Sequence, residues 1–273
     1  MSQYQLIAFD MDGTLLNSQK QVMPATMAAV DRALDAGKIV TLCTGRGLAE
    51  LGDYPALLAR LSYVICTSGA MVYQLTNQQI LYSHPLAPDQ VDRLLDFAAQ
   101  EGAMPQLLTD RSIVQRDHCI QMARFGMGVY QPMYQRVTDQ WENIQQQYQE
   151  DPFPVCKCNL YHTDIASRDR TEQRIRTAGM AVEMVHAEKT SLEISAKGVD
   201  KGSGLEWLCS YLSIPLSQTI AVGDANNDWG MFQKAGLAIA MGNAIERIQS
   251  AADVVVADCD HDGCAQAIDR YLL

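Results

Sequence analysis

The sequence has little positive charge and no long apolar run. Its 273 residues include 21 lysines and arginines against 32 aspartates and glutamates, a formal net charge of -11. A basic excess for binding a nucleic acid backbone or an anionic membrane surface is therefore missing. No apolar stretch approaches the ~18 residues of a membrane span, and the N-terminus lacks the pattern of a signal peptide. We expect a cytoplasmic protein with neither a nucleic acid nor a membrane as partner.

Closely spaced metal ligands of the zinc-binding type are also scarce. The eight cysteines are scattered, several within apolar stretches, which favours reduced, buried thiols over a disulfide framework. Cys156 and Cys158 form the only close pair, and no second pair at zinc-site spacing accompanies them. The five histidines share no metal-ligand spacing, so structural or surface roles are favoured for them.

Both ends of the chain alternate apolar strands with helices. A helix bounded by Pro24 and Gly37 lies between two expected strands, and a second expected helix carries Leu205, Leu208 and Leu212 at helical spacing. The expected strands are residues 4–9, 38–43, 63–66, 219–222, 237–241 and 254–256. Such near-continuous apolar strands are typical of a parallel sheet covered on both faces. The sequence therefore predicts an α/β fold with a doubly wound parallel sheet.

The middle of the chain differs from both ends in its pattern of polar and apolar residues. Residues 157–162 alternate polar and apolar side chains, which predicts a sheet with one wetter face, and residues 88–102 predict an amphipathic helix. We expect an inserted α+β domain at residues 83–189 and a core formed by residues 1–82 and 190–273. Within the insert, the methionine- and aromatic-rich stretch 122–134 could line a substrate pocket, although a core or oligomer contact is the favoured interpretation.

Four polar segments lie where strands of the expected sheet end. They are Asp10-Met11-Asp12-Gly13-Thr14, Thr44-Gly45-Arg46, Lys201-Gly202 and Gly223-Asp224-Ala225-Asn226-Asn227-Asp228. Ligands of open parallel sheets bind beyond the carboxyl ends of the strands, so these segments are expected to converge on one crevice. Taken singly, each also has an ordinary structural interpretation as a turn, a helix cap or a solvated lysine.

The residue types in these segments suit phosphoryl chemistry. A carboxylate such as Asp10 can attack phosphorus, and a second acid such as Asp12 can protonate a leaving oxygen and later deprotonate water. The hydroxyl of Thr44 and the ammonium of Lys201 can hold phosphate oxygens. Asp10 and Asp224 can supply carboxylates to magnesium, which prefers oxygen ligands.

Taken in order, D-M-D-G-T, T-G-R, K-G and G-D-A-N-N-D-W-G-M resemble the motifs of the haloacid dehalogenase superfamily. The chain most resembles the Cof-type phosphatases, whose large α/β cap is inserted between the second and third motifs. The resemblance implies a Rossmann-like core, a specificity-determining cap and a magnesium ion. It also implies that Asp10 is a nucleophile forming an aspartyl-phosphate and that Asp12 is the general acid and base, with a backbone carbonyl that helps to ligate the metal.

The same resemblance assigns the other motif residues. Asp224 would bind the metal directly with support from Asp228. The remaining residues, Thr44, Gly45, Arg46, Lys201 and Asn227, would bind phosphate or substrate. Two positions depart from the family pattern. Ser68 stands where Cof-type proteins usually have asparagine, and Ala225 stands where a larger polar residue is frequent.

The expected function is magnesium-dependent hydrolysis of small phosphorylated metabolites, either sugar phosphates or phosphorylated cofactors such as pyridoxal phosphate. A phosphosugar mutase would share the aspartyl-phosphate chemistry, and a non-catalytic phosphometabolite-binding regulator is a further alternative. A dehalogenase is disfavoured because Asp12 is present. The physiological substrate stays open, as does the choice between a monomer and a homodimer.

Overall fold

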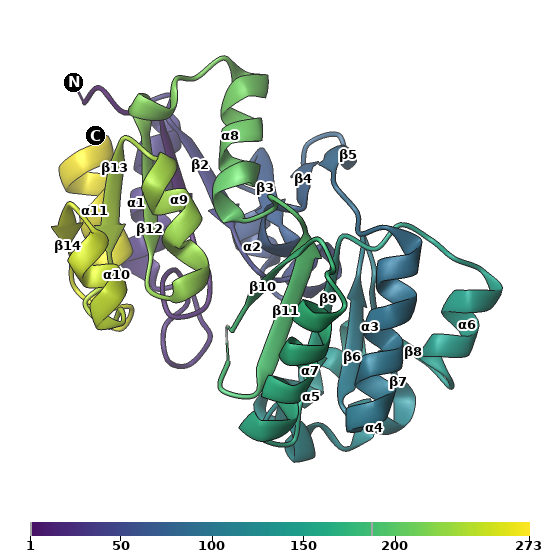
Figure 1. Ribbon diagram of the computed structural model, residues 1–273. Coiled ribbons are helices and arrows are strands. Elements are labelled where there is room, and N and C mark those ends of the chain that lie inside the picture. The colour runs from purple at the N-terminus through teal and green to yellow at the C-terminus, as the bar shows by residue number, and fades with distance from the viewer. Residues whose placement is uncertain (1, 187) are drawn as a thin grey trace. The chain divides into compact units, whose positions relative to one another are not determined.

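The computed structural model describes residues 2–186 and 188–273, and its elements are labelled in Figure 1. These residues form two compact units. The first unit comprises the chain up to Gly45 together with Tyr54–Tyr82 and Val199–Leu273. The second unit comprises Arg46–Asp53 and Ser83–Gly198.

The first unit is built on an eight-stranded sheet with the strand order β14-β13-β12-β1-β2-β3-β4-β5. Its strands are β1 (Leu6–Phe9), β2 (Ile39–Cys43), β3 (Tyr63–Cys66), β4 (Met71–Gln74), β5 (Gln79–Ser83), β12 (Thr219–Gly223), β13 (Leu237–Ala240) and β14 (Val254–Val255). The strands from β14 to β3 in this order pair parallel, whereas β4 pairs antiparallel with β3. Every residue of β1 and β12 is buried, as expected for strands covered on both faces.

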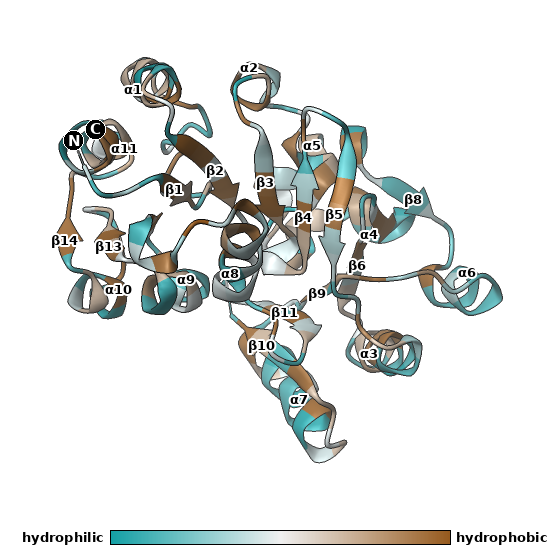
Figure 2. Ribbon diagram, turned by 90° about the horizontal axis from the view of Figure 1, so that it is seen from above, coloured by the Kyte–Doolittle hydropathy of each residue, from teal (hydrophilic) through white to brown (hydrophobic). Residues whose placement is uncertain are grey.

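Helices cover both faces of this sheet. Figure 2 shows α1, α2 and α11 on one face and α8, α9 and α10 on the other. Their bounds are α1 (Pro24–Asp35), α2 (Pro55–Leu58), α8 (Lys201–Leu212), α9 (Trp229–Lys234), α10 (Glu246–Ala251) and α11 (Gly263–Ala267). The predicted doubly wound α/β sheet is therefore confirmed.

The second unit contains a six-stranded sheet in the order β10-β11-β9-β6-β7-β8. The strands are β6 (Met104–Leu108), β7 (Ser112–Gln115), β8 (Asp139–Trp141), β9 (Lys157–Tyr161), β10 (Val182–Val185) and β11 (Ser191–Ala196). They pair antiparallel except for β7 and β8. The helices are α3 (Pro88–Glu101), α4 (Arg116–Ile120), α5 (Gln131–Val137), α6 (Ile144–Glu150) and α7 (Ile165–Thr177).

The boundaries of the second unit differ from those expected at residues 83 and 189. Strand β11 pairs with both β9 and β10, so residues beyond 189 belong to the second sheet. Arg46–Asp53 also belongs to this unit, because Glu50 is buried there and accepts hydrogen bonds from the Gln106 amide and, at 3.1 Å, from the Ser112 hydroxyl. One buried acid inside a short segment leaves no periodic pattern, so the sequence did not indicate that Arg46–Asp53 belongs to the second unit.

The polar face of strand β9 is buried, which corrects the expectation of a wetter face. Lys157 is fully buried in an ion pair with Glu193. Asn159 donates a hydrogen bond of 2.9 Å to the side-chain oxygen of Gln106 and another of 3.1 Å to the Tyr161 hydroxyl. Alternation in a sequence indicates a polar face, but polar side chains that bond to one another can be buried.

The stretch 122–134 is part of a hydrophobic cluster in the second unit. Met122, Phe125, Met127 and Tyr134 are buried there against Tyr161. The favoured core interpretation is therefore confirmed. The eight cysteines are all free and seven of them are buried, as expected of reduced thiols. Within residues 2–186 and 188–273, no helix has both the length and the apolar character needed to cross a bilayer.

Candidate active site

Two loops of the first unit meet at the carboxyl ends of adjacent strands. Asp10 directly follows β1, and its N–H donates to the carbonyl of Val222 in β12 at 3.0 Å. Asp224 directly follows β12, and its carboxylate accepts a 2.8 Å hydrogen bond from the hydroxyl of Thr14. The parallel register of β1 and β12 therefore brings together two loops that lie more than two hundred residues apart in the sequence.

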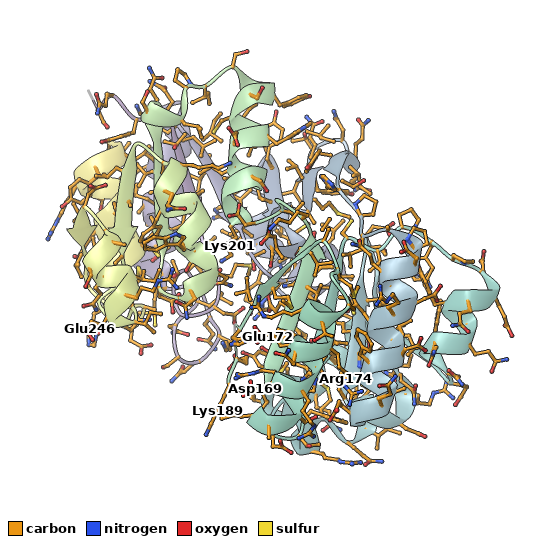
Figure 3. All side chains as sticks on the ribbon, in the orientation of Figure 1. Asp169, Glu172, Arg174, Lys189, Lys201 and Glu246 are labelled. Carbon is orange, nitrogen blue, oxygen red and sulfur yellow. The ribbon has the colours of Figure 1, made fainter. Side chains whose placement is uncertain are left out.

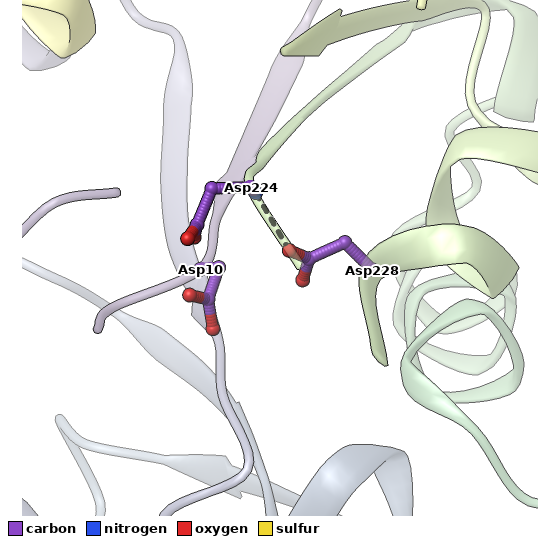
Figure 4. Close-up of side chains that lie close together, drawn as sticks. All are labelled: Asp10, Asp224 and Asp228. Carbon is purple, nitrogen blue, oxygen red and sulfur yellow. Dashed lines mark hydrogen bonds between the residues drawn. The ribbon is translucent and has the colours of Figure 1, made fainter. Parts of the chain in front are cut away.

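Three carboxylates gather at this edge of the sheet. Asp10, Asp224 and Asp228 each offer one oxygen that lies within 4.8 Å of those of the other two (Figure 4). Oxygen ligands in a small cluster of this kind are the donor set that magnesium prefers. The predicted metal residues Asp10, Asp224 and Asp228 thus lie together.

Lys201 is the cation of the cluster. It is the first residue of α8 (Figure 3), its side chain is fully buried, and its Nζ contacts Asp10 Oδ1 and lies 2.6 Å from Asp228 Oδ1. Burial alone would lower the pKa of Lys201, but the carboxylates of Asp10 and Asp228 outweigh burial and raise it. Lys201 is therefore an ammonium at neutral pH, as its expected role toward phosphate requires.

Asp228 fixes the backbone of the loop that carries Asp224. Its Oδ2 accepts hydrogen bonds from the N–H groups of Asp224 and Ala225, at 2.8 and 2.9 Å. A Cβ at residue 223 would lie 2.4 Å from the Asp228 carboxyl carbon, so only glycine fits there. The fully buried Asp228 side chain therefore fixes the backbone on one side and holds Lys201 on the other.

The cluster carries more negative than positive charge. Burial raises the pKa of Asp10 well above its usual value, and the neighbouring Asp228 and Asp224 raise it further against the opposing effect of Lys201. Burial and Asp228 raise the pKa of Asp224 to about 6. Ionising these two groups therefore costs more in the folded protein than in water, and further positive charge would offset that cost. The donor set and its charge both fit a divalent cation.

Asp12 lies in the same loop but has a different partner. Its Oδ1 is 2.7 Å from the Nζ of Lys20, and both side chains are about one-third exposed to solvent. The backbone of Lys20 is left-handed with a φ of 59°, in a turn where Asn17 Oδ1 accepts hydrogen bonds from the N–H groups of Gln19 and Gln21. Sequence reasoning missed Lys20. The available signal was a lysine shortly after the acid pair, in a turn marked by asparagine.

The remaining predicted residues are distributed over both units. Thr44 follows β2, the strand beside β1, and is buried, with Gly45 next to it. Arg46 belongs to the second unit, where its Nη1 lies 3.6 Å from the sulfur of Met133. Asn227 lies between Asp224 and Asp228 in sequence, and its buried Oδ1 has no hydrogen-bond partner within the residues that the structure describes.

The fold and the site together define a class of protein. The acidic cluster and the buried lysine lie at the carboxyl ends of the strands of a doubly wound parallel sheet, as in α/β enzymes whose sites bind a cation and an anionic ligand. The family model described as haloacid dehalogenase-like hydrolase matches residues 7–268. The chain therefore belongs to the haloacid dehalogenase-like hydrolase family.

Known relatives agree with this membership. Pyridoxal phosphate phosphatase YbhA of Escherichia coli (strain K12) is 25% identical over 98% of each chain. 5-Amino-6-(5-phospho-D-ribitylamino)uracil phosphatase YcsE of Bacillus subtilis (strain 168) is also 25% identical, covering 98% of this chain and 96% of its own. A solved haloacid dehalogenase-like hydrolase from B. subtilis shares the fold with a TM-score of 0.86 at 24% identity, over 97% of this chain and 99% of that chain. The predicted family and the phosphatase class are confirmed.

Proposed function

We propose that the protein is a magnesium-dependent phosphatase of small phosphorylated metabolites that works through an aspartyl-phosphate on Asp10. The observation that carries this proposal is the buried cluster in which Lys201 contacts Asp10 and Asp228 while Asp224 lies within reach of both acids. A nucleophilic carboxylate and a buried ammonium at one point are the parts that phosphoryl transfer requires.

In the first step an oxygen of Asp10 forms a bond to phosphorus while the bond from phosphorus to the leaving oxygen breaks. Asp12 gives a proton to that oxygen, and in the second step it accepts a proton from the water that attacks the aspartyl-phosphate. Phosphate leaves and Asp10 is regenerated. The nearby ammonium of Lys20 offers a partner for the ionised form of Asp12 between the two steps.

Lys201 and Thr44 hold the transferring group, whose charge is spread over its equatorial oxygens. Asp10 and Asp224 would hold Mg²⁺ with their carboxylates, with the backbone carbonyl of Asp12 as a further ligand and Asp228 in support. When bound, the ion supplies positive charge that offsets the carboxylates and the phosphate. The raised pKa values of Asp10 and Asp224 support this assignment.

We assign the choice of substrate to the second unit and phosphate contacts to Gly45, Arg46 and Asn227. The relatives are named for pyridoxal phosphate and for a phosphorylated ribitylaminouracil, and a further relative from Serratia proteamaculans (strain 568) is an HMP-PP phosphatase. These compounds have in common a small organic phosphate. We therefore propose this class of substrate, with sugar phosphates and pyridoxal phosphate as the first compounds to test.

Phosphate release from a panel of such compounds tests the proposal. The purified protein is assayed with Mg²⁺ and with EDTA, beside the variant Asp10→Asn and the control Asp35→Asn, which changes an exposed aspartate of α1. We expect release that requires Mg²⁺ and Asp10 but not Asp35. Release that survives EDTA or Asp10→Asn would contradict the mechanism, and formation of an isomer without free phosphate would identify a mutase.

A further inference from the structure

The turn that follows β3 has an unusual backbone. Thr67, Ser68 and Gly69 all have left-handed φ angles, of 49°, 56° and 93°. Glycine adopts this region freely, whereas Ser does so with strain and a β-branched residue such as Thr is a genuine outlier there. Two successive non-glycine residues therefore adopt a conformation that their own chemistry disfavours.

The side chain of Thr67 adds a second unfavourable feature. It is fully buried, and its hydroxyl has no hydrogen-bond partner in the part of the chain that the structure describes. A buried hydroxyl without a partner loses the hydrogen bonds that water would give it. Such a turn persists only where its surroundings determine it, and strain of this kind concentrates at functional sites. The contacts of the turn therefore identify what it holds in place.

On one side the turn holds Thr44. The N–H of Ser68 donates to the Thr44 carbonyl at 3.0 Å, and the N–H of Thr44 donates to the Ile65 carbonyl at 2.9 Å. Both backbone groups of Thr44 are thus held by β3 and the turn that continues from it. In the register of β2 and β3 an extended continuation of β3 would present the Thr67 N–H to the Thr44 carbonyl, whereas the left-handed turn presents the Ser68 N–H in its place.

On the other side the turn touches the start of α8. A Cβ at residue 69 would lie 1.9 Å from the carbonyl oxygen of Asp200 and 3.1 Å from the backbone nitrogen of Lys201. Asp200 is the N-cap of α8, since its Oδ1 accepts a 2.7 Å hydrogen bond from the N–H of Ser203. Gly69 therefore packs directly on the residue that fixes where α8 begins.

The start of α8 is held from a second direction as well. A Cβ at Gly202 would lie 2.2 Å from the carbonyl oxygen of Gly230, which belongs to α9. Backbone thus meets backbone on two sides of Lys201, so this helix end cannot shift without moving the turn or α9. Lys201 takes its position from these contacts.

We propose that the turn Thr67–Gly69 is a positioning element that sets the distance between Thr44 and Lys201, the two residues assigned to hold the transferring phosphoryl group. This inference rests on the proposed function and adds residues that none of the four motifs contains. The strain is retained because an unstrained turn would not make the Ser68 contact to Thr44 and the Gly69 contact to Asp200 together.

A pair of glycine substitutions tests this role. Gly69→Ala places a methyl group against Asp200, whereas the control Gly37→Ala has a comparable φ of 72° and nothing within 4 Å. Both variants place alanine at a positive φ and so bear a backbone penalty, but only the first places a methyl group against the start of α8. Misplacing reacting groups by an ångström costs about 100-fold, so we expect kcat/KM for p-nitrophenyl phosphate to fall by about that factor in Gly69→Ala.

A second measurement separates positioning from general damage. Inhibition by inorganic phosphate reports on Thr44 and Lys201, whereas half-saturating Mg²⁺ reports on Asp10 and Asp224, which the turn does not contact. In Gly69→Ala we expect phosphate inhibition to weaken by about tenfold while half-saturating Mg²⁺ changes less than about threefold, and Gly37→Ala to leave both within about twofold. Equal losses for both ligands, or unchanged phosphate inhibition, would overturn the inference.

A backbone ester at Ser68, introduced by semisynthesis, covers the case in which Gly69→Ala does not fold. The ester removes only the Ser68 N–H that donates to the Thr44 carbonyl, and we again expect a selective loss of phosphate inhibition. Phosphate inhibition at the wild-type level in the ester variant would refute the role of this contact. A different result would refute the proposed function, and this inference with it. The wild-type protein would then show neither hydrolysis of p-nitrophenyl phosphate in Mg²⁺ nor phosphorylation by this compound.

Discussion

Replacing Lys201 by methionine tests the electrostatic balance of the site. Lys201 and Asp228 have fully buried side chains, and Asp10 is only 6% exposed, so water cannot take the place of the lost ammonium. Removing one partner of a buried ion pair destabilises a protein by about 3–5 kcal/mol. At about 2–4 °C per kcal/mol for a chain of this size, Lys201→Met should lower the melting temperature by about 6–20 °C.

The effect should depend on the metal. In EDTA the variant keeps three carboxylates without a compensating charge, whereas bound Mg²⁺ offsets part of their repulsion. Differential scanning calorimetry of wild type and Lys201→Met, each in EDTA and in Mg²⁺, measures this difference. We expect the larger loss of stability in EDTA, and kcat lower by about 100-fold or more in Mg²⁺.

The second unit offers a matched control. Lys157 is also fully buried and is paired with Glu193, which is 14% exposed, but it belongs to the second unit and not to the acidic cluster. Lys157→Met should therefore destabilise the protein equally in EDTA and in Mg²⁺. Equal losses in both conditions for Lys201→Met, or no loss at all, would refute the assignment of Lys201 as the balancing charge of a metal site.

Three further predictions follow from the same geometry. Asp10→Asn should lower turnover by a factor on the order of 10⁴, because the nucleophile is lost. The same variant should have a higher melting temperature in EDTA, because the raised pKa of Asp10 means that the ionised carboxylate destabilises the folded state. A lower melting temperature would contradict this. Burial and Asp228 raise the pKa of Asp224 to about 6. Below about pH 6, Mg²⁺ must displace a proton from Asp224, so the Mg²⁺ affinity measured by calorimetry should fall by about tenfold per pH unit. An affinity that does not depend on pH would contradict the assignment of Asp224 as a ligand. Ser68→Asn should raise the midpoint of urea unfolding, because asparagine tolerates a left-handed φ better than serine. An unchanged midpoint would show that Ser68 is not strained.

The sequence predicted the parallel sheet well because its strands carry a strong local signal. β1 is apolar throughout and β12 carries an apolar centre, and the polar residues Asp10 and Asp224 mark the points where these strands end. Ligands bind beyond the carboxyl ends of strands in sheets of this kind, so the convergence of distant motifs followed from topology alone.

Other features depend on contacts that leave no periodic pattern. The ion pair between Lys20 and Asp12 lies at a turn where Lys20 has a left-handed φ. Arg46–Asp53 joins the second unit through isolated side-chain contacts, among them Glu50 with Ser112 and Asp53 with Arg136. The polar face of β9 was expected to be wet because alternation cannot distinguish hydration from a network of buried side chains.

The central claim is that Asp10 becomes phosphorylated during turnover. Wild-type protein is mixed with p-nitrophenyl phosphate and Mg²⁺, quenched in acid within one turnover, and digested for peptide mass spectrometry. We predict a phosphoryl group on the peptide that contains Asp10 and none in Asp10→Asn. Release of p-nitrophenol in the same experiment with no phosphorylated aspartate, or with phosphate on a different residue, would contradict the account.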